Sequence, residues 1–370
     1  MIERDSCYFC TSSFQLFAIT ALAIERKETA DLYIDPQFKD AEIFAARLKG
    51  LDIFQNVELI DSKRIYGKYM SAGPGFINHL QIANTYLNVE DIAQTILLEG
   101  VSYRNIFLSS KAYLPRMVQL YFIKAKKSVQ TYYFDDGAGS YENDRAYKIS
   151  TSDRILRSVL FGKSAAKTDY EKFLFSSEIY SELNEGDRTL VKPIVRFWDK
   201  QSGKEIINKV FGVKNKPDIK ERLIILDQPK DELFASEDLT RINSIYNSLI
   251  QKLGYENVVV KKHPRSSDED FTNIKNFESQ GVPFELYCLN MDMDRKIIVT
   301  HSSTAAATPK ILFDQEPIVI VLSKLIETIA GEKNLFVEFF EAVKKAYRNP
   351  ERLYIPSNEQ ELSKIIEIIV

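Results

Sequence analysis

Short apolar runs alternate with amphipathic stretches along most of this chain, and that alternation limits the folds that it can adopt. In the first half, five runs are short, bounded by polar residues and rich in β-branched or aromatic side chains, as buried strands are. The stretches between them carry apolar residues at helical spacing. The expected strands are 7–11, 31–34, 57–60, 105–108 and 129–134, and the expected helices are 14–24, 41–48, 76–87 with 92–98, and 114–124.

The alternation begins again after residue 220, following a less regular part of the chain. In that irregular part we expect a helix at 152–161, a last strand at 172–176 and a connector at 190–217. The later expected strands are 222–226, 257–262, 296–300 and 317–322, and the later helices are 239–253, 335–347 and 359–370.

A repeated strand–helix pattern predicts parallel sheets with right-handed crossovers and helices on both faces. The chain has 370 residues, more than a single hydrophobic core usually supports. We therefore expect an α/β protein with two doubly wound domains, 1–195 and 221–370, joined by a connector at 196–220. Periplasmic-binding-type folds and sugar epimerases would give the same pattern, so the alternation alone does not choose among such proteins.

Composition and charge exclude several classes of protein. A net charge of −3 argues against nucleic-acid binding, which needs a concentrated cationic surface. No stretch approaches the roughly 20 apolar residues that span a bilayer, and the N-terminus lacks the pattern of a secretory signal, so we expect a cytoplasmic protein. The basic stretch 192–222 contains Phe197 and Trp198 and is either a solvated connector or surface helix, or a peripheral membrane contact.

Cys7 and Cys10 have the C-x-x-C spacing that occurs in redox and zinc sites. They lie in the first expected strand, however, and no second pair of Cys or His residues is nearby in the sequence. We expect the two cysteines to pack in the core and to bind no metal.

Asp135, Asp136 and Gly137 directly follow the expected strand 129–134. The carboxyl ends of parallel strands are where open α/β sheets bind ligands. One interpretation is a tight turn in which the aspartates accept hydrogen bonds from backbone N–H groups. The other is a catalytic base, because aromatic residues such as Tyr132 and Tyr141 would desolvate a carboxylate and raise its pKa.

Two further strings follow strands in the second half. His263 and Pro264 come after the strand 257–262, beside basic residues, where an imidazole could meet a phosphate as a cation or an acid. The string 301–304, His-Ser-Ser-Thr, follows the strand 296–300 and precedes a helix start. Its hydroxyls either cap the helix or bind an anion there, and the two roles are compatible.

Together these strings resemble the motifs of the bacterial sialyltransferases, which carry an acidic-acidic-Gly motif in the N-terminal domain and His-Pro and Ser-Ser motifs in the C-terminal domain. The best overall likeness is to the lipooligosaccharide and capsule type, glycosyltransferase family 52, supported by the turn 10–16 after the first strand. The likeness extends over most of the chain. It implies a GT-B-like fold, in which two Rossmann-like domains face a central cleft, with CMP-sialic acid as donor and no metal or other cofactor.

The resemblance also implies roles for individual residues. Asp135 or Asp136 would be the catalytic base and His263 the acid, and the sequence leaves open which aspartate acts. The implied donor-binding residues are Pro264, Ser302, Ser303, Thr304, Asp227 and Gln228, and the implied acceptor-side loop contains Thr11, Ser12, Ser13, Gln15 and Gly137.

The expected function is inverting transfer of sialic acid to a hydroxyl of a lipid-linked glycan acceptor, either lipooligosaccharide or capsule. Three alternatives stay open: transfer from another nucleotide sugar, a CDP-polyol phosphotransferase, and a binding module without catalysis. The aromatic stretch 336–340 is either a homodimer surface or core. The sequence does not identify the acceptor glycan or the linkage.

Overall fold

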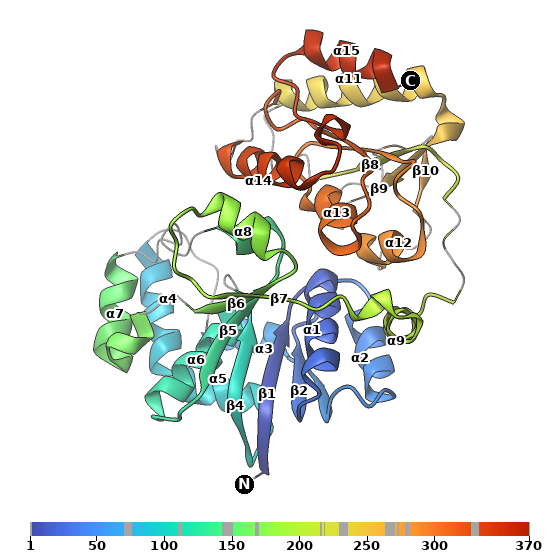
Figure 1. Cartoon of the computed structure of the whole chain (residues 1–370). Coiled ribbons are helices and arrows are strands. Elements are labelled where there is room, and N and C mark those ends of the chain that lie inside the picture. Colours follow the sequence, from blue (N-terminus) through green and yellow to red (C-terminus); the bar gives the residue numbers. More distant parts are fainter. Residues whose placement is uncertain are drawn as a thin grey trace. The chain divides into compact units, whose positions relative to one another are not determined.

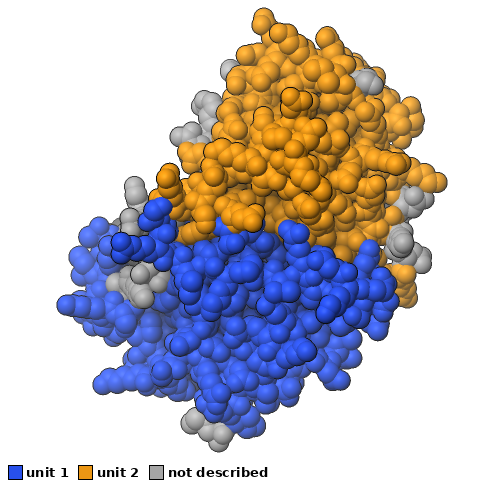
Figure 2. All heavy atoms as spheres, viewed as in Figure 1, with its two compact units in different colours: residues 1–177, 186–212 blue, residues 178–185, 213–370 orange. Residues whose placement is uncertain are grey.

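The structure is a computed structural model that contains two parallel β-sheets (Figure 1). The chain divides into two compact units, residues 1–177 with 186–212, and residues 178–185 with 213–370, coloured separately in Figure 2. The described residues are 2–69, 76–109, 113–142, 151–166, 170–214, 217, 219–228, 236–262, 271, 274–277, 282–326 and 333–369.

The first unit is built on a seven-stranded sheet in the order β3-β2-β1-β4-β5-β6-β7, and every neighbouring pair is parallel. This order places the first strand in the interior of the sheet, between β2 and β4, which explains why its second half is fully buried. The strands are β1 (Ile2–Cys10), β2 (Ala30–Ile34), β3 (Asn56–Leu59), β4 (Val101–Leu108), β5 (Gln130–Phe134), β6 (Glu171–Leu174) and β7 (Val191–Pro193).

Helices cover both faces of this sheet (Figure 1). On one face, Phe17 packs against Trp198 and Phe44 against Phe211, each with ring centroids 5.0 Å apart. The core of the other face joins side chains of the central strands to the helices between residues 62 and 161. The helices are α1 (Ser13–Arg26), α2 (Ala41–Lys49), α3 (Ser62–Tyr69), α4 (Phe76–Leu87), α5 (Val89–Ile96), α6 (Tyr113–Lys124), α7 (Thr151–Phe161), α8 (Ser177–Leu183, most of it in the second unit) and α9 (Gln201–Phe211).

The second unit has a six-stranded parallel sheet in the order β10-β9-β8-β11-β12-β13. Its central strands are fully buried runs of β-branched residues and leucine, as expected for a sheet covered on both faces. The elements are β8 (Leu223–Leu226), α11 (Ser236–Leu253), β9 (Val258–Lys261), β10 (Lys275–Asn276), α12 (Phe284–Asn290), β11 (Ile297–Thr300), α13 (Thr308–Phe313), β12 (Ile318–Val321), α14 (Lys333–Ala346), β13 (Leu353–Tyr354) and α15 (Glu359–Ile369).

The expected α/β class with two Rossmann-like parallel-sheet domains is confirmed. The expected strands and the helices between them are present, with shifted ends. Among the described residues, seven helices and strands were not given as expected elements: α3, α8, β7, α9, β10, α12 and β13. The stretch 190–217 was interpreted as a connector, but it contributes β7 to the first sheet and α9 to the cover of that sheet.

Two stretches left open by the sequence have buried side chains. In the basic stretch 192–222, Trp198 is only 4% exposed and packs on Phe17, so its indole is part of the core. In the aromatic stretch 336–340, Phe339 and Phe340 are buried in the second unit. Among the residues that the structure describes, no helix is both long enough and apolar enough to cross a membrane.

Candidate active site

The turn after β5 holds Asp135 in a buried position with both carboxylate oxygens engaged. Its Oδ1 accepts from the Gly137 N–H at 3.0 Å, and its Oδ2 accepts from the Tyr141 hydroxyl at 2.7 Å and the Phe175 N–H at 3.1 Å. Burial nevertheless raises the pKa of this carboxyl to about 6, because three hydrogen bonds only partly replace bulk water. Asp135 is 1% exposed and fixes the shape of the turn.

Asp136, the next residue, is partly exposed and points its carboxylate to another strand end. Its Oδ1 accepts from the Gln15 side-chain amide at 2.7 Å, and its backbone N–H donates to the Ser140 hydroxyl at 2.7 Å. Gly137 follows with φ 91° and ψ −161°, a conformation that side chains with a Cβ avoid. The sharp turn therefore depends on a glycine directly after the carboxylate pair.

The loop after β1 meets this turn through Gln15. The Ser12 hydroxyl accepts from the Gln15 N–H at 3.1 Å and so caps α1. The side-chain oxygen of Gln15 accepts from the Thr11 N–H at 2.7 Å, which leaves its amide nitrogen to donate to Asp136. Gln15 is 3% exposed, so this bridge between the two strand ends is shielded from solvent.

Asp35, at the end of β2, is a residue of this sheet edge that the motifs did not include. It is 1% exposed, its N–H donates to the Cys10 carbonyl at 2.8 Å, and burial raises the pKa of its carboxyl. Its position directly after an expected strand was the available signal. Cys10 lies close to the carboxylates of Asp35 and Asp136, and burial of this thiol raises its pKa well above the usual range, so the thiol stays protonated.

Lys172, on β6, is the second residue that the motifs did not include. It is 1% exposed, and its ammonium donates to the carbonyls of Ser140 at 3.0 Å and Glu142 at 2.9 Å. These bonds anchor the end of the acidic turn. No local signal marks this role, because the lysine is distant in sequence from the turn that it supports.

In the second unit, three neighbouring strands bring their carboxyl ends together. Leu226, the last residue of β8, lies opposite Lys261 on β9 and Thr300 on β11. The Asp227 N–H continues this ladder by donating to the Lys261 carbonyl at 3.0 Å. Asp227 is therefore placed between the strand that leads to the His-Pro string and the strand that leads to the Ser-Ser string, and Gln228 follows it.

His263 and Pro264 lie outside the described residues. The strand that precedes them ends at Lys261, whose ammonium donates to the Val282 carbonyl at 3.1 Å. Burial lowers the pKa of this lysine to about 8. The strand that precedes the His-Pro string in the sequence thus ends in a lysine that releases its proton more easily than a solvated one.

The string after β11 divides into a buried and a partly exposed half. His301 is 2% exposed; its Nε2 lies 2.7 Å from the Ile326 carbonyl and therefore donates to it, and burial lowers the pKa of the ring. Ser302 is 4% exposed, whereas Ser303 and Thr304 are partly exposed. Ser303 stands at the N-cap of a short 3₁₀ helix, but its side chain makes no capping hydrogen bond there.

Chemically, the edge of the first unit offers a partly exposed carboxylate held by an amide, and the edge of the second offers hydroxyls beside strand ends. A carboxylate of this kind can accept a proton from a hydroxyl, and hydroxyls can hydrogen-bond a phosphate. Within the described ranges, no group of three or more His, Cys, Asp or Glu side chains could hold a metal ion. Cys7, Cys10 and Cys288 are buried free thiols.

Two solved structures share the fold of the whole chain at low sequence identity. The glycotransferase of kitacinnamycin has a TM-score of 0.51 and 10% identity over 100% of this chain and 91% of that chain. The UDP-GlcNAc 2-epimerase of Methanocaldococcus jannaschii has a TM-score of 0.54 and 14% identity over 99% and 92% of the two chains. These matches agree with the expected GT-B-like class of fold, and the sugar epimerases, which the strand–helix pattern left open, share it.

Sequence comparison gives a family rather than a single relative. No curated protein sequence matches the chain. The family model described as alpha-2,8-polysialyltransferase matches residues 8–322, a range that starts within β1 and ends directly after β12. Because this match spans most of the chain, the protein is a glycosyltransferase that belongs to the alpha-2,8-polysialyltransferase family.

Proposed function

We propose that the protein transfers sialic acid from CMP-sialic acid to a hydroxyl of a glycan acceptor, with inversion at the anomeric carbon and without a metal. The family match supports the class of donor sugar. The observation that carries the assignment of the site is the hydrogen bond from Gln15 to Asp136. It holds a partly exposed carboxylate at the edge of the sheet where ligands of such folds bind.

Of the two aspartates, we assign the base to Asp136. Asp135 is almost fully buried and accepts three hydrogen bonds, so an acceptor hydroxyl could reach it only after the turn had opened. Asp136 is partly exposed, and its bond from Gln15 orients it without covering it. Asp135 is then a positioning residue that keeps Asp136 in place.

The leaving phosphate would be stabilised from the second unit. The transition state of glycosyl transfer resembles an oxocarbenium ion, so negative charge grows on the phosphate as its bond to the sugar breaks. We assign this role to His263, with Pro264 shaping its loop, and to the partly exposed Ser303 and Thr304. Ser302, Asp227 and Gln228 would line the nucleotide.

The acceptor follows from the family description, which names an α2,8 linkage between sialic acid units. We infer that the acceptor is a glycan ending in sialic acid, carried on lipooligosaccharide or a capsule precursor. Thr11, Ser12 and Ser13 adjoin Gln15 and would line the side of the site that this glycan approaches. A lipid-linked acceptor implies peripheral contact with the inner face of the cell membrane.

The test is a transfer assay with purified protein, CMP-sialic acid and an α2,8-linked disialyl oligosaccharide, with and without EDTA. We expect CMP release, a product heavier by one sialic acid, and the same rate in both conditions. Asp136→Asn is expected to lower the rate by at least about a hundredfold, whereas Asp52→Asn, a change at an exposed carboxylate, leaves it unchanged.

Two further arms of the assay separate the alternatives. Turnover of CDP-glycerol in place of CMP-sialic acid would favour a phosphotransferase. Full activity of the Asp136→Asn variant would show that Asp136 is not the catalytic base. NMR of the product distinguishes inversion from retention, because the chemical shifts of the C3 protons of the transferred sialic acid report the configuration at its anomeric carbon. Retention would overturn the single-displacement mechanism.

A further inference from the structure

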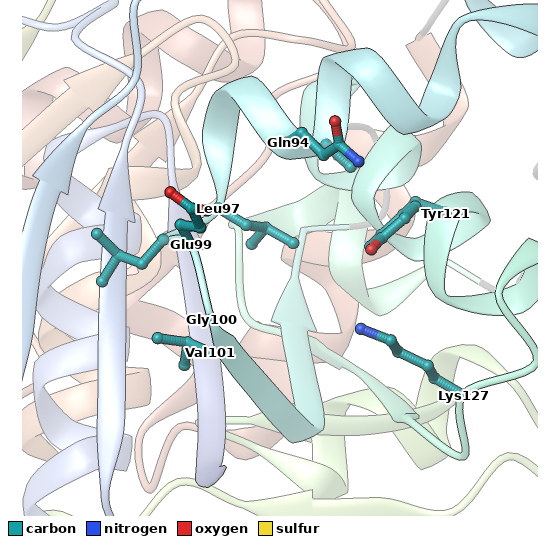
Figure 3. Close-up of a pocket in the computed structure, with 9 residues that line it drawn as sticks. Gln94, Leu97, Glu99, Gly100, Val101, Tyr121 and Lys127 are labelled. Carbon is teal, nitrogen blue, oxygen red and sulfur yellow. The ribbon is translucent and has the colours of Figure 1, made fainter. Parts of the chain in front are cut away.

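A cavity of about 520 Å³ opens at the amino end of β4 in the first unit. It lies between the end of α5, the segment that enters β4 and the end of α6, as Figure 3 shows. Its volume falls within the range of small-molecule sites. The lining residues are Ala93, Gln94, Leu97, Leu98, Glu99, Gly100, Val101, Tyr121 and Lys127.

The cavity is at the opposite edge of the sheet from the candidate active site. Val101 is the first residue of β4, while Asp136 follows the last residue of the parallel neighbour β5. Eight residues of strand separate the two edges, which is roughly 25 Å at the usual rise per residue. A ligand of the size of this cavity therefore cannot reach the acidic turn.

The cavity lining contains one cationic side chain, Lys127, and one carboxylate, Glu99. The Lys127 ammonium lies 5.4 Å from the centroid of the Tyr121 ring and 5.7 Å from that of Phe122. Among the described carboxylates, none forms an ion pair with it, and Figure 3 shows Glu99 on the far side of Leu97 from Tyr121 and Lys127. The side that holds Tyr121 and Lys127 therefore has a positive charge that an anionic ligand can neutralise.

The remaining lining is mixed. Ala93, Leu97 and Val101 supply apolar surface, and Gln94 with the Tyr121 hydroxyl supplies neutral hydrogen-bonding groups. A long apolar chain would leave these polar groups without partners, and a small inorganic anion would leave the apolar surface uncovered. A compact molecule with one carboxylate, several hydroxyls and an apolar C–H face could contact the cation, the neutral polar groups and the apolar side chains of the cavity.

We propose that this cavity is a second carbohydrate site that binds one acidic sugar unit, with the sugar carboxylate on Lys127. That the site prefers an acidic sugar to another compact anion rests on the proposed function. That the ligand is an anion rests on Lys127 alone. Such a unit has two sources, the free sugar and the end of an acidic glycan, and both present the same carboxylate.

The test measures dissociation constants by ligand-observed NMR with N-acetylneuraminic acid, its neutral methyl ester, α2,8-linked disialic acid and octanoate. We expect the acid to bind in the millimolar range and the ester at least about tenfold more weakly, because a charge-assisted bond is lost. Disialic acid binding more tightly than the monomer assigns the site to a glycan end, and equal binding assigns it to the free sugar.

Variant proteins test whether the acid binds in this cavity. Lys127→Gln should weaken binding of the acid about tenfold or more, while Lys126→Gln, a change at an adjacent exposed lysine outside the lining, should not. Leu97→Trp, which fills the cavity, should abolish binding, and Asp136→Asn should preserve it. Unchanged affinity in Lys127→Gln or in Leu97→Trp, equal binding of acid and ester, or preferential binding of octanoate would overturn the proposal.

These results are independent of the transfer assay. If no sugar is transferred but Lys127→Gln weakens binding, the proposed function fails and the second site stands. If transfer proceeds but the acid binds Lys127→Gln as well as the wild-type protein, the proposed function stands and the second site fails.

Discussion

The side-chain amide of Gln15 donates to the carboxylate of Asp136 at 2.7 Å, across 121 residues of sequence. This bond ties the first turn of α1 to the loop after β5 and therefore joins the ends of two strands that are not adjacent in the sheet. Since the other end of the same amide accepts from the Thr11 N–H, the three residues form one hydrogen-bonded unit around the buried Gln15. Several expected outcomes depend on it.

Gln15→Glu should move the pH profile of transfer without changing the shape of the loop. A glutamate can still accept from Thr11, but it places a second buried carboxylate beside Asp136, which raises the pKa of the pair. We expect the acid limb of the kcat/KM profile to shift upward by about one pH unit or more, so that activity recovers at alkaline pH.

The measurement for Gln15→Glu is a pH–rate profile combined with thermal unfolding at pH 8. A profile that keeps its acid limb while the variant folds normally would show that Asp136 does not titrate in the reaction. Gln15→Leu serves as the comparison, because it removes both hydrogen bonds and should lower activity at every pH.

Asp135→Asn should change how stability depends on pH. Burial raises the pKa of Asp135 from 3.8 in a model carboxyl to about 6, so the native state favours the protonated form. The stability that this group contributes is fully present below pH 3.8 and is lost as pH rises through about 6. The variant lacks this titration. From pH 4.5 to 6.5 the wild-type protein should therefore lose about 2 kcal/mol more than the variant.

Urea unfolding at several pH values checks the Asp135 prediction. Asp52→Asn, at an exposed position, is the matched control and should track the wild-type curve. A difference between wild-type and Asp135→Asn that stays constant from pH 4.5 to 6.5 would contradict the assigned burial effect. The constant part of the difference reports the hydrogen bonds lost from Gly137 or Phe175 when an oxygen becomes an amide nitrogen.

The acidic turn illustrates which features of the candidate site could be predicted from the sequence and which could not. The position of the aspartate pair after a buried strand and among aromatic residues predicts a raised pKa for a carboxylate there, and burial raises the pKa of Asp135. Which aspartate is engaged could not be predicted. That choice depends on the Phe175 N–H and on Gln15, 40 and 121 residues away, and neither contact leaves a local pattern.

The fold shows the same limit. Central strands such as β4 and β11 carry enough β-branched and aromatic residues to be identified from the sequence. The strands β7, β10 and β13 have only two or three residues each, too few for any periodicity, and exist because a neighbouring strand supplies the pairing. Helix α9 lies in the stretch that we interpreted as a connector, although Ile207, Val210 and Phe211 give it an apolar side; Phe211 packs on Phe44.

Ser303→Ala and Ser302→Ala should have different effects. Ser303 is partly exposed and its side chain makes no capping hydrogen bond, so its hydroxyl is available to a donor phosphate. Ser302, in contrast, is only 4% exposed. We expect Ser303→Ala to raise the KM for CMP-sialic acid about tenfold, the cost of one hydrogen bond to a charged group. Ser302→Ala should raise the KM less than Ser303→Ala does, because the Ser302 side chain is almost fully buried. Steady-state kinetics with varied donor concentration measure both KM values. Equal effects of the two substitutions would contradict the assignment of different roles to Ser302 and Ser303.

Gly137→Ala should cost both stability and activity, because Gly137 has φ 91° and ψ −161° in the turn that carries Asp136. A Cβ in this region of backbone space costs about 1–3 kcal/mol, and relief of the strain would rotate the peptide that follows Asp136.

Gly162 also has a positive φ, 89°, and a Cβ there would meet nothing within 4 Å. Gly162→Ala is therefore the control for backbone strain alone. We expect both variants to unfold at lower temperature but only Gly137→Ala to lose transfer, by at least about tenfold, since the 1 Å-scale displacement of a base is enough for such a loss. Transfer that survives in Gly137→Ala at the wild-type rate would mean that the geometry of the acidic turn does not set the position of the base.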